Sequence, residues 1–195
     1  MTIGGLLTDL DMSKGAFYHY FGSKAELLEA LIVRMRGEAE AILAPILEDP
    51  GLTALEKLQH WFEAIARWKT VRKAYLLSLL RVWYDDDNAI VRHKLRIDTL
   101  AWLAPMLRPV VQQGIEEDVF STSYPDHLPH VLYSLLYDMG DALAGLLLST
   151  ESDGVDREQA RATLAAYTDA LERALGAPQH SLVLVDSGTF EEWFG

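Results

Sequence analysis

The sequence contains no cysteine among its 195 residues. Disulfides and thiolate metal sites are therefore excluded, and a reducing compartment fits this composition. The start of the chain lacks the basic-then-apolar pattern of a secretory signal. The most apolar run, Ala142 to Leu148, is far shorter than the roughly 20 residues of a membrane-spanning helix. These absences predict a cytoplasmic protein with no membrane contact, no metal and no cofactor.

Positive charge is also scarce, since 17 Lys and Arg residues stand against 29 Asp and Glu residues and the net charge is −12. Attraction to phosphate dominates affinity for DNA, so this balance taken alone argues against a nucleic-acid partner. The distribution weakens the objection, because residues 1–24 carry Asp9 and Asp11 against Lys14 and Lys24 and are neutral. An acidic body with a small DNA-contacting end is therefore physically workable.

Sustained strand-like alternation is missing before the last residues, whereas apolar residues recur with helical spacing. Half of the residues are hydrophobic, which allows a sizeable core. Capping boxes at 23–26 and 53–56, and the cap Asp156, mark helix starts, while Gly114 is a natural helix stop. We predict an all-α fold with helices at 2–8, 13–20, 71–84, 88–113, 126–149 and 156–175, and further helices that begin after Ser23 and Thr53.

A helix-turn-helix is predicted at the start of the chain. The short helices at 2–8 and 13–20 are joined by a tight turn, and Ser13 caps the second helix. This pair suits insertion of the second helix into a DNA major groove, where its N-terminal residues meet base edges. Phe17 and Phe21, four residues apart, would face inward and fix this helix against its neighbours.

The second helix carries residue types that DNA contact requires. Gly15 and Ala16 are small enough for the backbone to approach DNA closely, and Lys14 and Lys24 can neutralise phosphates. Hydrogen bonds to phosphates or bases can come from Tyr18, His19 and Tyr20. An ordinary helical hairpin with exposed polar residues is the alternative interpretation.

The string Met12-Ser-Lys-Gly-Ala-Phe-Tyr-His-Tyr-Phe-Gly-Ser-Lys24, followed by Leu27 and Leu28, resembles the recognition helix and following cap of TetR-family repressors. The resemblance covers residues 2–31, and the rest of the chain is similar to the family in its helical layout. It implies a phosphate contact for Thr2. It also implies DNA-contact roles for Ser13, Lys14, Gly15, Tyr18, His19, Tyr20 and Lys24.

The family has a further helix before the helix-turn-helix, often preceded by a basic arm, and this sequence shows no counterpart of it. Leu6, Leu7 and Leu10 would then lose part of their packing partner. Either the start is truncated or the DNA-binding end is weakened. Asp11 also stands where the family usually has Gly, and Asp tolerates a left-handed turn better than most residues.

We divide the chain into a DNA-binding domain at 1–30, a helical ligand-binding and dimerisation domain at 31–176 and a tail at 177–195, whose conformation stays open. The middle of the chain is rich in aromatic residues, and the resemblance implies a cavity there for a small apolar or aromatic ligand. Burial in the core is the alternative for each aromatic residue. The expected pocket residues are Trp61, Trp68, Trp83, Trp102 and Tyr137.

The two long C-terminal helices combine wide apolar faces with small residues such as Gly140, Ala144 and Gly145. Helices of this kind can pack closely against a second copy as a four-helix bundle. The resemblance implies that this is the dimer interface, and burial within one chain is the alternative.

Together these features predict a dimeric repressor that binds a palindromic operator and is released by a small ligand, although activation stays open. An enzyme is the main alternative, because Asp126, His127 and His130 have a loosely metal-like spacing and the acidic run 85–87 could bind Mg²⁺. No Ser-His-Asp signature or glycine-rich phosphate loop supports catalysis. A ligand-binding helical dimer that has lost tight DNA binding is the second alternative.

Overall fold

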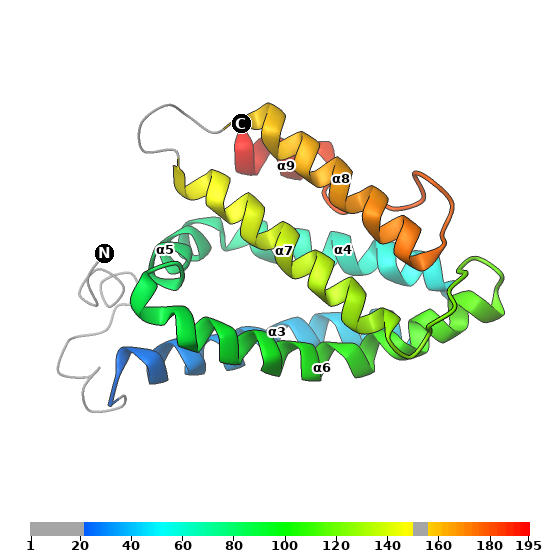
Figure 1. The fold of residues 1–195 in the computed structure, drawn as a ribbon, viewed down its shortest axis with the longest axis horizontal. Coiled ribbons are helices and arrows are strands. Elements are labelled where there is room, and N and C mark those ends of the chain that lie inside the picture. Colours follow the sequence, from blue (N-terminus) through cyan, green and yellow to red (C-terminus); the bar gives the residue numbers. More distant parts are fainter. Residues whose placement is uncertain (1–21, 150–155) are drawn as a thin grey trace.

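The computed structural model describes residues 22–149 and 156–195, which form a bundle of helices (Figure 1). Helix α3 packs between α4 and α6, and α7 packs between α6 and α8. The described ranges contain no strand, which confirms the all-α prediction, and the expected helices at 2–8 and 13–20 lie outside them. In chain order the elements are α3 (Lys24–Leu47), α4 (Ala54–Val71), α5 (Lys73–Trp83), the 3-10 helix η1 (Asp86–Asn88), α6 (Ala89–Glu116), α7 (Leu128–Leu148), α8 (Arg157–Leu175) and α9 (Ser187–Phe194).

Side-chain caps fix helix starts where the sequence predicted them. At α4 the Glu56 N–H donates to Thr53 Oγ1 at 3.3 Å, and the Thr53 N–H donates to Glu56 Oε2 at 2.9 Å. At α3 the Glu26 N–H donates to Ser23 Oγ at 3.2 Å, while the Glu26 carboxylate accepts the N–H of Gly22 at 2.7 Å. Both caps satisfy backbone donors that a helix start leaves without partners.

Gly114 does not end α6, which continues to Glu116, so the predicted stop is wrong. A Cβ at Gly114 would lie 1.9 Å from the ring of Phe120, so the glycine makes room for that buried ring. A left-handed stop occurs instead at Gly176, where φ is 64° directly after α8. The start of α8 follows the predicted cap, since the Asp156 carboxylate accepts the N–H three residues on at 2.9 Å.

Three apolar clusters hold the helices together, and two of them, which we call the main core and the small core, include residues of α3. The main core joins the C-terminal halves of α3 and α6 to α4, α7, α8 and the tail, with buried members that include Leu43, Leu58, Leu107, Leu132 and Leu171. The small core joins the start of α3 to α5 and to the start of α6 through Leu27, Leu28, Leu31, Leu79, Val82, Val91 and Leu95. Helices α3 and α6 therefore contribute to both cores, and their middle turns lie between them.

The tail at 177–195 packs onto the body, which answers the question that the sequence left open. Leu182 and Leu184 are buried in the main core. The Glu172 carboxylate on α8, itself only 4% exposed, accepts the backbone N–H groups of His180 and Leu182, each at 3.0 Å. A buried carboxylate is stabilised by such hydrogen bonds, so Glu172 and the two leucines hold this segment jointly.

No strand forms at 181–185 despite its strand propensity, because a side chain pairs with its backbone. The Val183 N–H donates to Gln59 Oε1 at 2.9 Å, and Gln59 Nε2 donates to the Val183 carbonyl at 3.2 Å. Helix α9 then buries Phe190 and Phe194, which stack at 5.0 Å between ring centroids. The tail is thus part of the folded body.

Replacing Leu182 with Ala should lower the free energy of unfolding by about 2 to 4 kcal/mol, because it leaves a cavity in the main core. Urea unfolding followed by circular dichroism measures the loss. The neighbouring Val183→Ala is the matched control, since that side chain is 49% exposed and its removal should cost about 0.5 kcal/mol or less. Equal losses in the two variants would show that the tail does not insert Leu182.

Candidate functional site

The residues predicted to contact DNA lie at or before the start of α3. Lys24 is the first residue of α3. The others fall outside the described residues: Thr2, Ser13, Lys14, Gly15, Ala16, Tyr18, His19 and Tyr20. Immediately after them, Leu27, Leu28 and Leu31 are buried in the small core, so the first turns of α3 are fixed against α5 and α6.

Between the two cores, α3 is held by polar contacts. Glu38 and Glu40 follow Leu31 of the small core and precede Leu43 of the main core. The indole N–H of Trp102 on α6 donates to Glu40 Oε2 at 3.1 Å. These contacts lie where α3 crosses from one core to the other.

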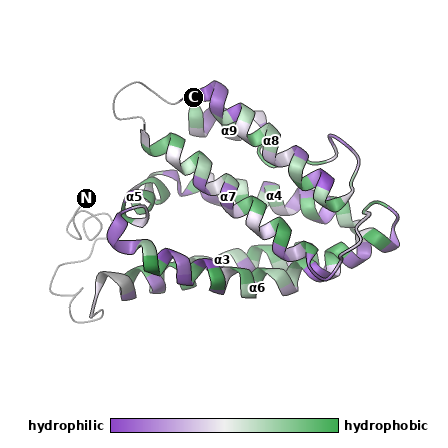
Figure 2. Ribbon diagram, viewed as in Figure 1, coloured by the Kyte–Doolittle hydropathy of each residue, from purple (hydrophilic) through white to green (hydrophobic). Residues whose placement is uncertain are grey.

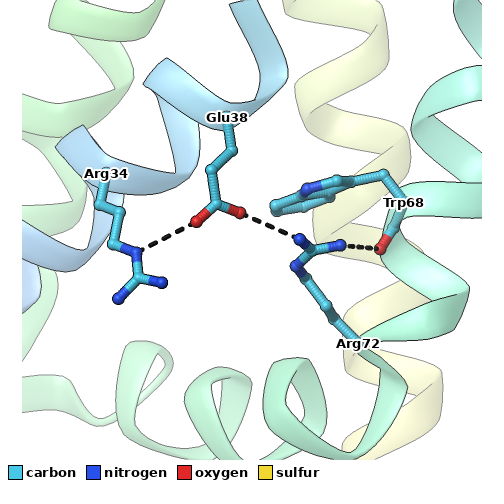
Figure 3. Close-up of polar contacts among 4 residues, drawn as sticks. All are labelled: Arg34, Glu38, Trp68 and Arg72. Carbon is cyan, nitrogen blue, oxygen red and sulfur yellow. Dashed lines mark hydrogen bonds and ion pairs between the residues drawn. The ribbon is translucent and has the colours of Figure 1, made fainter. Parts of the chain in front are cut away.

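Four residues, which we call the Arg72 cluster, join α3 to the junction of α4 and α5: Arg34, Glu38, Trp68 and Arg72 (Figure 3). The Glu38 carboxylate pairs with Arg34 Nε at 3.1 Å and with an Arg72 guanidinium nitrogen at 3.3 Å. Arg72 also donates to the Trp68 carbonyl at 3.4 Å, and its guanidinium carbon lies 4.7 Å from the indole centroid. Because Arg72 caps the end of α4 and precedes α5, the cluster links three helices.

The Trp68 side chain contains a buried donor without an acceptor. Its exposed fraction is 8%, and its indole N–H has no hydrogen-bond partner. An unsatisfied buried donor typically costs about 1–3 kcal/mol, so such groups are uncommon in native structures. The indole groups of Trp102 and Trp193, by contrast, donate to Glu40 and Thr70.

A second polar group, which we call the Tyr84 cluster, joins the C-terminal end of α5 to α6 and α7. It consists of Tyr84, Arg92, Arg96, Tyr133, Tyr137 and Asp141. The Tyr84 hydroxyl donates to the Asp141 carboxylate, and Arg92 donates to the carbonyls of Trp83 and Asp85 at 2.6 and 3.0 Å. Burial, followed by the hydrogen bond to Asp141, raises the pKa of Tyr84 far above its usual value.

In the rest of the Tyr84 cluster, Arg96 contacts two tyrosines. The Arg96 guanidinium carbon lies 4.5 Å from the ring centroid of Tyr137, and the Tyr133 hydroxyl donates to the Arg96 carbonyl at 3.0 Å. Burial raises the pKa of Tyr133 to about 12, and it also raises the pKa of Tyr137. These tyrosines therefore stay neutral donors well above physiological pH.

The five aromatics predicted to line a pocket have different surroundings. Trp61 is buried in the main core and stacks on Phe62 at 5.1 Å, and it lines a void of about 10 Å³. The other four line neither this void nor a larger surface hollow of about 310 Å³ between α6 and α7. Trp83 packs against the small core, Trp102 and Tyr137 pack against the main core, and Trp68 belongs to the Arg72 cluster.

Two of the acidic residues considered as metal ligands make other contacts. Asp126 pairs with Arg108 at 3.4 Å and precedes α7, which begins at Leu128 rather than at the predicted 126. Asp85 caps η1 by accepting the Asp87 N–H at 3.1 Å. In residues 22–149 and 156–195, no three His, Asp or Glu side chains are grouped so that they could hold a metal ion.

Sequence reasoning named one aromatic member of each cluster, Trp68 and Tyr137, but missed the charged members. Glu38 and Arg34 are spaced four apart on one helix, which is the signal for their pairing. Nothing in the sequence indicates that Arg72, from another helix, reaches the same carboxylate. Only the packing of the helices brings these polar side chains together.

The raised tyrosine pKa values predict that stability falls at alkaline pH. The unfolded chain loses these protons near pH 10, whereas Tyr133 in the folded chain holds its proton to about pH 12. The free energy of unfolding should therefore be insensitive to these groups below about pH 10 and decline above it. Urea unfolding across this range measures the decline.

Tyr133→Phe should make this decline shallower by up to about 1.4 kcal/mol per pH unit, the value of one proton. At about pH 8 no tyrosine loses its proton in either state. The difference in the free energy of unfolding between the variant and the parent at that pH therefore measures the loss of the hydrogen bond to the Arg96 carbonyl. An unchanged slope above pH 10 would contradict the pKa assignment.

Comparison with known proteins finds a match at the start of the chain. Residues 2–31 match the family model described as bacterial regulatory proteins, tetR family. No curated protein matches the chain. The matched range ends inside α3, after the three leucines that anchor it in the small core, and it contains the predicted motif at 12–24. The start of the chain, at residues 2–31, therefore matches the N-terminal helix-turn-helix region of TetR-family regulators.

Proposed function

We propose that the protein is a dimeric transcriptional repressor that a small-molecule ligand releases from a palindromic operator in the cytoplasm. The observation that carries this proposal is the course of α3, which begins inside the family match and ends in the main core. A rearrangement of the body can therefore move the helix-turn-helix region. No catalytic step is part of the proposal.

In this proposal each subunit inserts its helix at 13–20 into one major groove. Thr2 and Lys24 contact phosphates beside the groove. The groove contacts come from Ser13, Lys14, Gly15, Ala16, Tyr18, His19 and Tyr20. We divide the chain into a DNA-binding domain at 1–30 and a body from residue 31, and the buried leucines of the tail support its inclusion in the body.

The ligand is placed in the body, among the aromatic residues Trp61, Trp68, Trp83, Trp102 and Tyr137. Trp68 has the strongest support, because its buried indole N–H lacks an acceptor that a ligand can supply. It also lies against Arg72, which pairs with Glu38 on α3. A ligand at Trp68 is therefore one side chain away from the helix that leads to the DNA-binding domain.

The dimer interface is proposed on the outer faces of α7 and α8. Most of the exposed residues on α7 follow one helical stripe: Val131, Ser134, Asp138, Ala142 and Gly145. On α8 the exposed face includes Ala162, Ala165 and Ala166. Small side chains let helices from two copies approach closely, and Figure 2 shows hydrophobic residues along much of α7.

Helix α7 is also long and apolar enough to cross a membrane, which the short apolar run in the sequence did not reveal. Only 17% of its most apolar 18-residue window is buried, so much of its surface lacks a partner within the chain. Asp138 and Asp141 lie in the middle of α7, where a carboxylate in lipid costs about 2.5–3.5 kcal/mol. A second copy of the chain therefore fits this surface better than lipid.

Tyr18→Ala and Lys24→Ala should each weaken operator binding by about tenfold, and Lys24→Ala should also reduce the salt dependence by about one phosphate contact. Gel shifts with DNA selected from a random pool measure both effects. Lys94→Ala, at an exposed position of α6, is the matched control for loss of one positive charge. If both variants bound as tightly as the parent, the recognition-helix assignment would fail.

Gly145→Glu should convert the dimer to monomers while leaving the helical content intact. A Cβ at Gly145 meets no atom within 4 Å, so the monomer tolerates the side chain, whereas a closely packed partner helix does not. Analytical ultracentrifugation gives the mass. Gly37→Glu makes the same change at an equally open glycine in α3 and should stay dimeric. A dimer in both variants would place the interface elsewhere.

A further inference from the structure

We propose that the Arg72 cluster binds the carboxylate or sulfonate group of a small organic anion. In the bound state Trp68 Nε1 donates to an oxygen of the anion, and Arg72 exchanges Glu38 for the same group. The inference rests on the proposed function and deepens it, because it names the class of ligand and the contact through which that ligand acts.

The unsatisfied indole N–H of Trp68 determines what the ligand must offer. An indole nitrogen can only donate, so its missing partner is a hydrogen-bond acceptor. Trp68 is only 8% exposed, and no acceptor in the described part of the chain lies within hydrogen-bond distance of its indole nitrogen. A solute that carries acceptor oxygens removes this deficit, whereas a purely apolar solute does not.

The charges beside Trp68 favour an anion over a neutral acceptor. Arg34 and Arg72 share the single carboxylate of Glu38, so the three side chains carry one net positive charge. The planar guanidinium of Arg72 is suited to carboxylate and sulfonate oxygens, with which it forms paired hydrogen bonds. An anion at this place balances the charge and satisfies the indole together.

The Glu38–Arg72 ion pair of the cluster is partly exposed to solvent. The side chains of Arg72 and Glu38 are 38% and 31% exposed, and the pair is therefore weak enough for a competing anion to replace Glu38. After the exchange Glu38 keeps its bond to Arg34, which lies on the same helix. Helix α3 then loses its tie to the junction of α4 and α5.

The test uses the full chain and a pair of fluorescent probes, anilinonaphthalene sulfonate and phenylnaphthylamine, which differ by the sulfonate group. Trp68→Phe should weaken binding of the sulfonate by about tenfold, because the hydrogen bond to a charged oxygen is lost. Binding of the uncharged probe should change less than about twofold, since the variant keeps an aromatic ring. Trp193→Phe, in the tail, is the matched control and should alter neither affinity.

Glu38→Gln provides an independent arm, because it removes the carboxylate that competes for Arg72. It should tighten binding of the sulfonate probe and leave the uncharged probe unchanged. Circular dichroism and urea unfolding establish that each variant is folded. Equal effects of Trp68→Phe on both probes, no effect on either, or weaker sulfonate binding to Glu38→Gln would each overturn the proposal.

Operator binding, measured separately by gel shift, distinguishes this proposal from the proposed function. Sulfonate binding that depends on Trp68 and Glu38 but does not release DNA would support the anion site and count against ligand-controlled repression. Release of DNA by another compound, with sulfonate binding independent of Trp68, would overturn the anion site and leave the repressor function standing.

Discussion

Helix α3 is packed into two apolar cores at once, and this limits how the N-terminal region can move. Leu27, Leu28 and Leu31 are buried at one end and Leu43 and Leu47 at the other. Burial of each leucine contributes about 1.5–3 kcal/mol, whereas a partly exposed ion pair such as Glu38–Arg72 contributes about 1 kcal/mol or less. The cores therefore fix where α3 lies, and the polar contacts between them can only adjust its tilt.

The tail adds a second constraint on the same body. Its leucines fill the main core beside Trp61, and Gln59 of α4 and Glu172 of α8 hold its backbone. The aromatic residues of α4 are therefore covered from the side that the tail occupies, and the void left beside Leu182 is about 10 Å³. A volume of this size is too small for a ligand, so Trp61 is a weaker candidate for ligand contact than Trp68 on the same helix.

The helices were largely predictable because their signals are local. The caps Ser23, Thr53 and Asp156 act within one turn, so their role follows from neighbouring residues. Gly114 was misread because its role depends on Phe120, whose ring returns to the helix only after the chain has turned. The tail and the Arg72 cluster depend on residues more than 30 positions apart, such as Glu38 with Arg72 or Gln59 with Val183, and helical spacing carries no information about such pairs. The candidate site was therefore predictable in its aromatic content and not in its charges.

The small free energy of the Glu38–Arg72 ion pair is consistent with a regulatory role. A stronger tie would hold α3 regardless of ligand, and a contact without charge would give an anion nothing to exchange. In the proposed dimer the tie is present twice, so its loss in both subunits is worth at most about 2 kcal/mol, which corresponds to a change of up to roughly thirtyfold in affinity for DNA. Coupling energies between sites typically fall at about 1–3 kcal/mol, and two weak ion pairs reach that range without disturbing either core. In the proposed mechanism, a partly exposed charge pair on a helix anchored at both ends connects an anion in the body with the helix-turn-helix region.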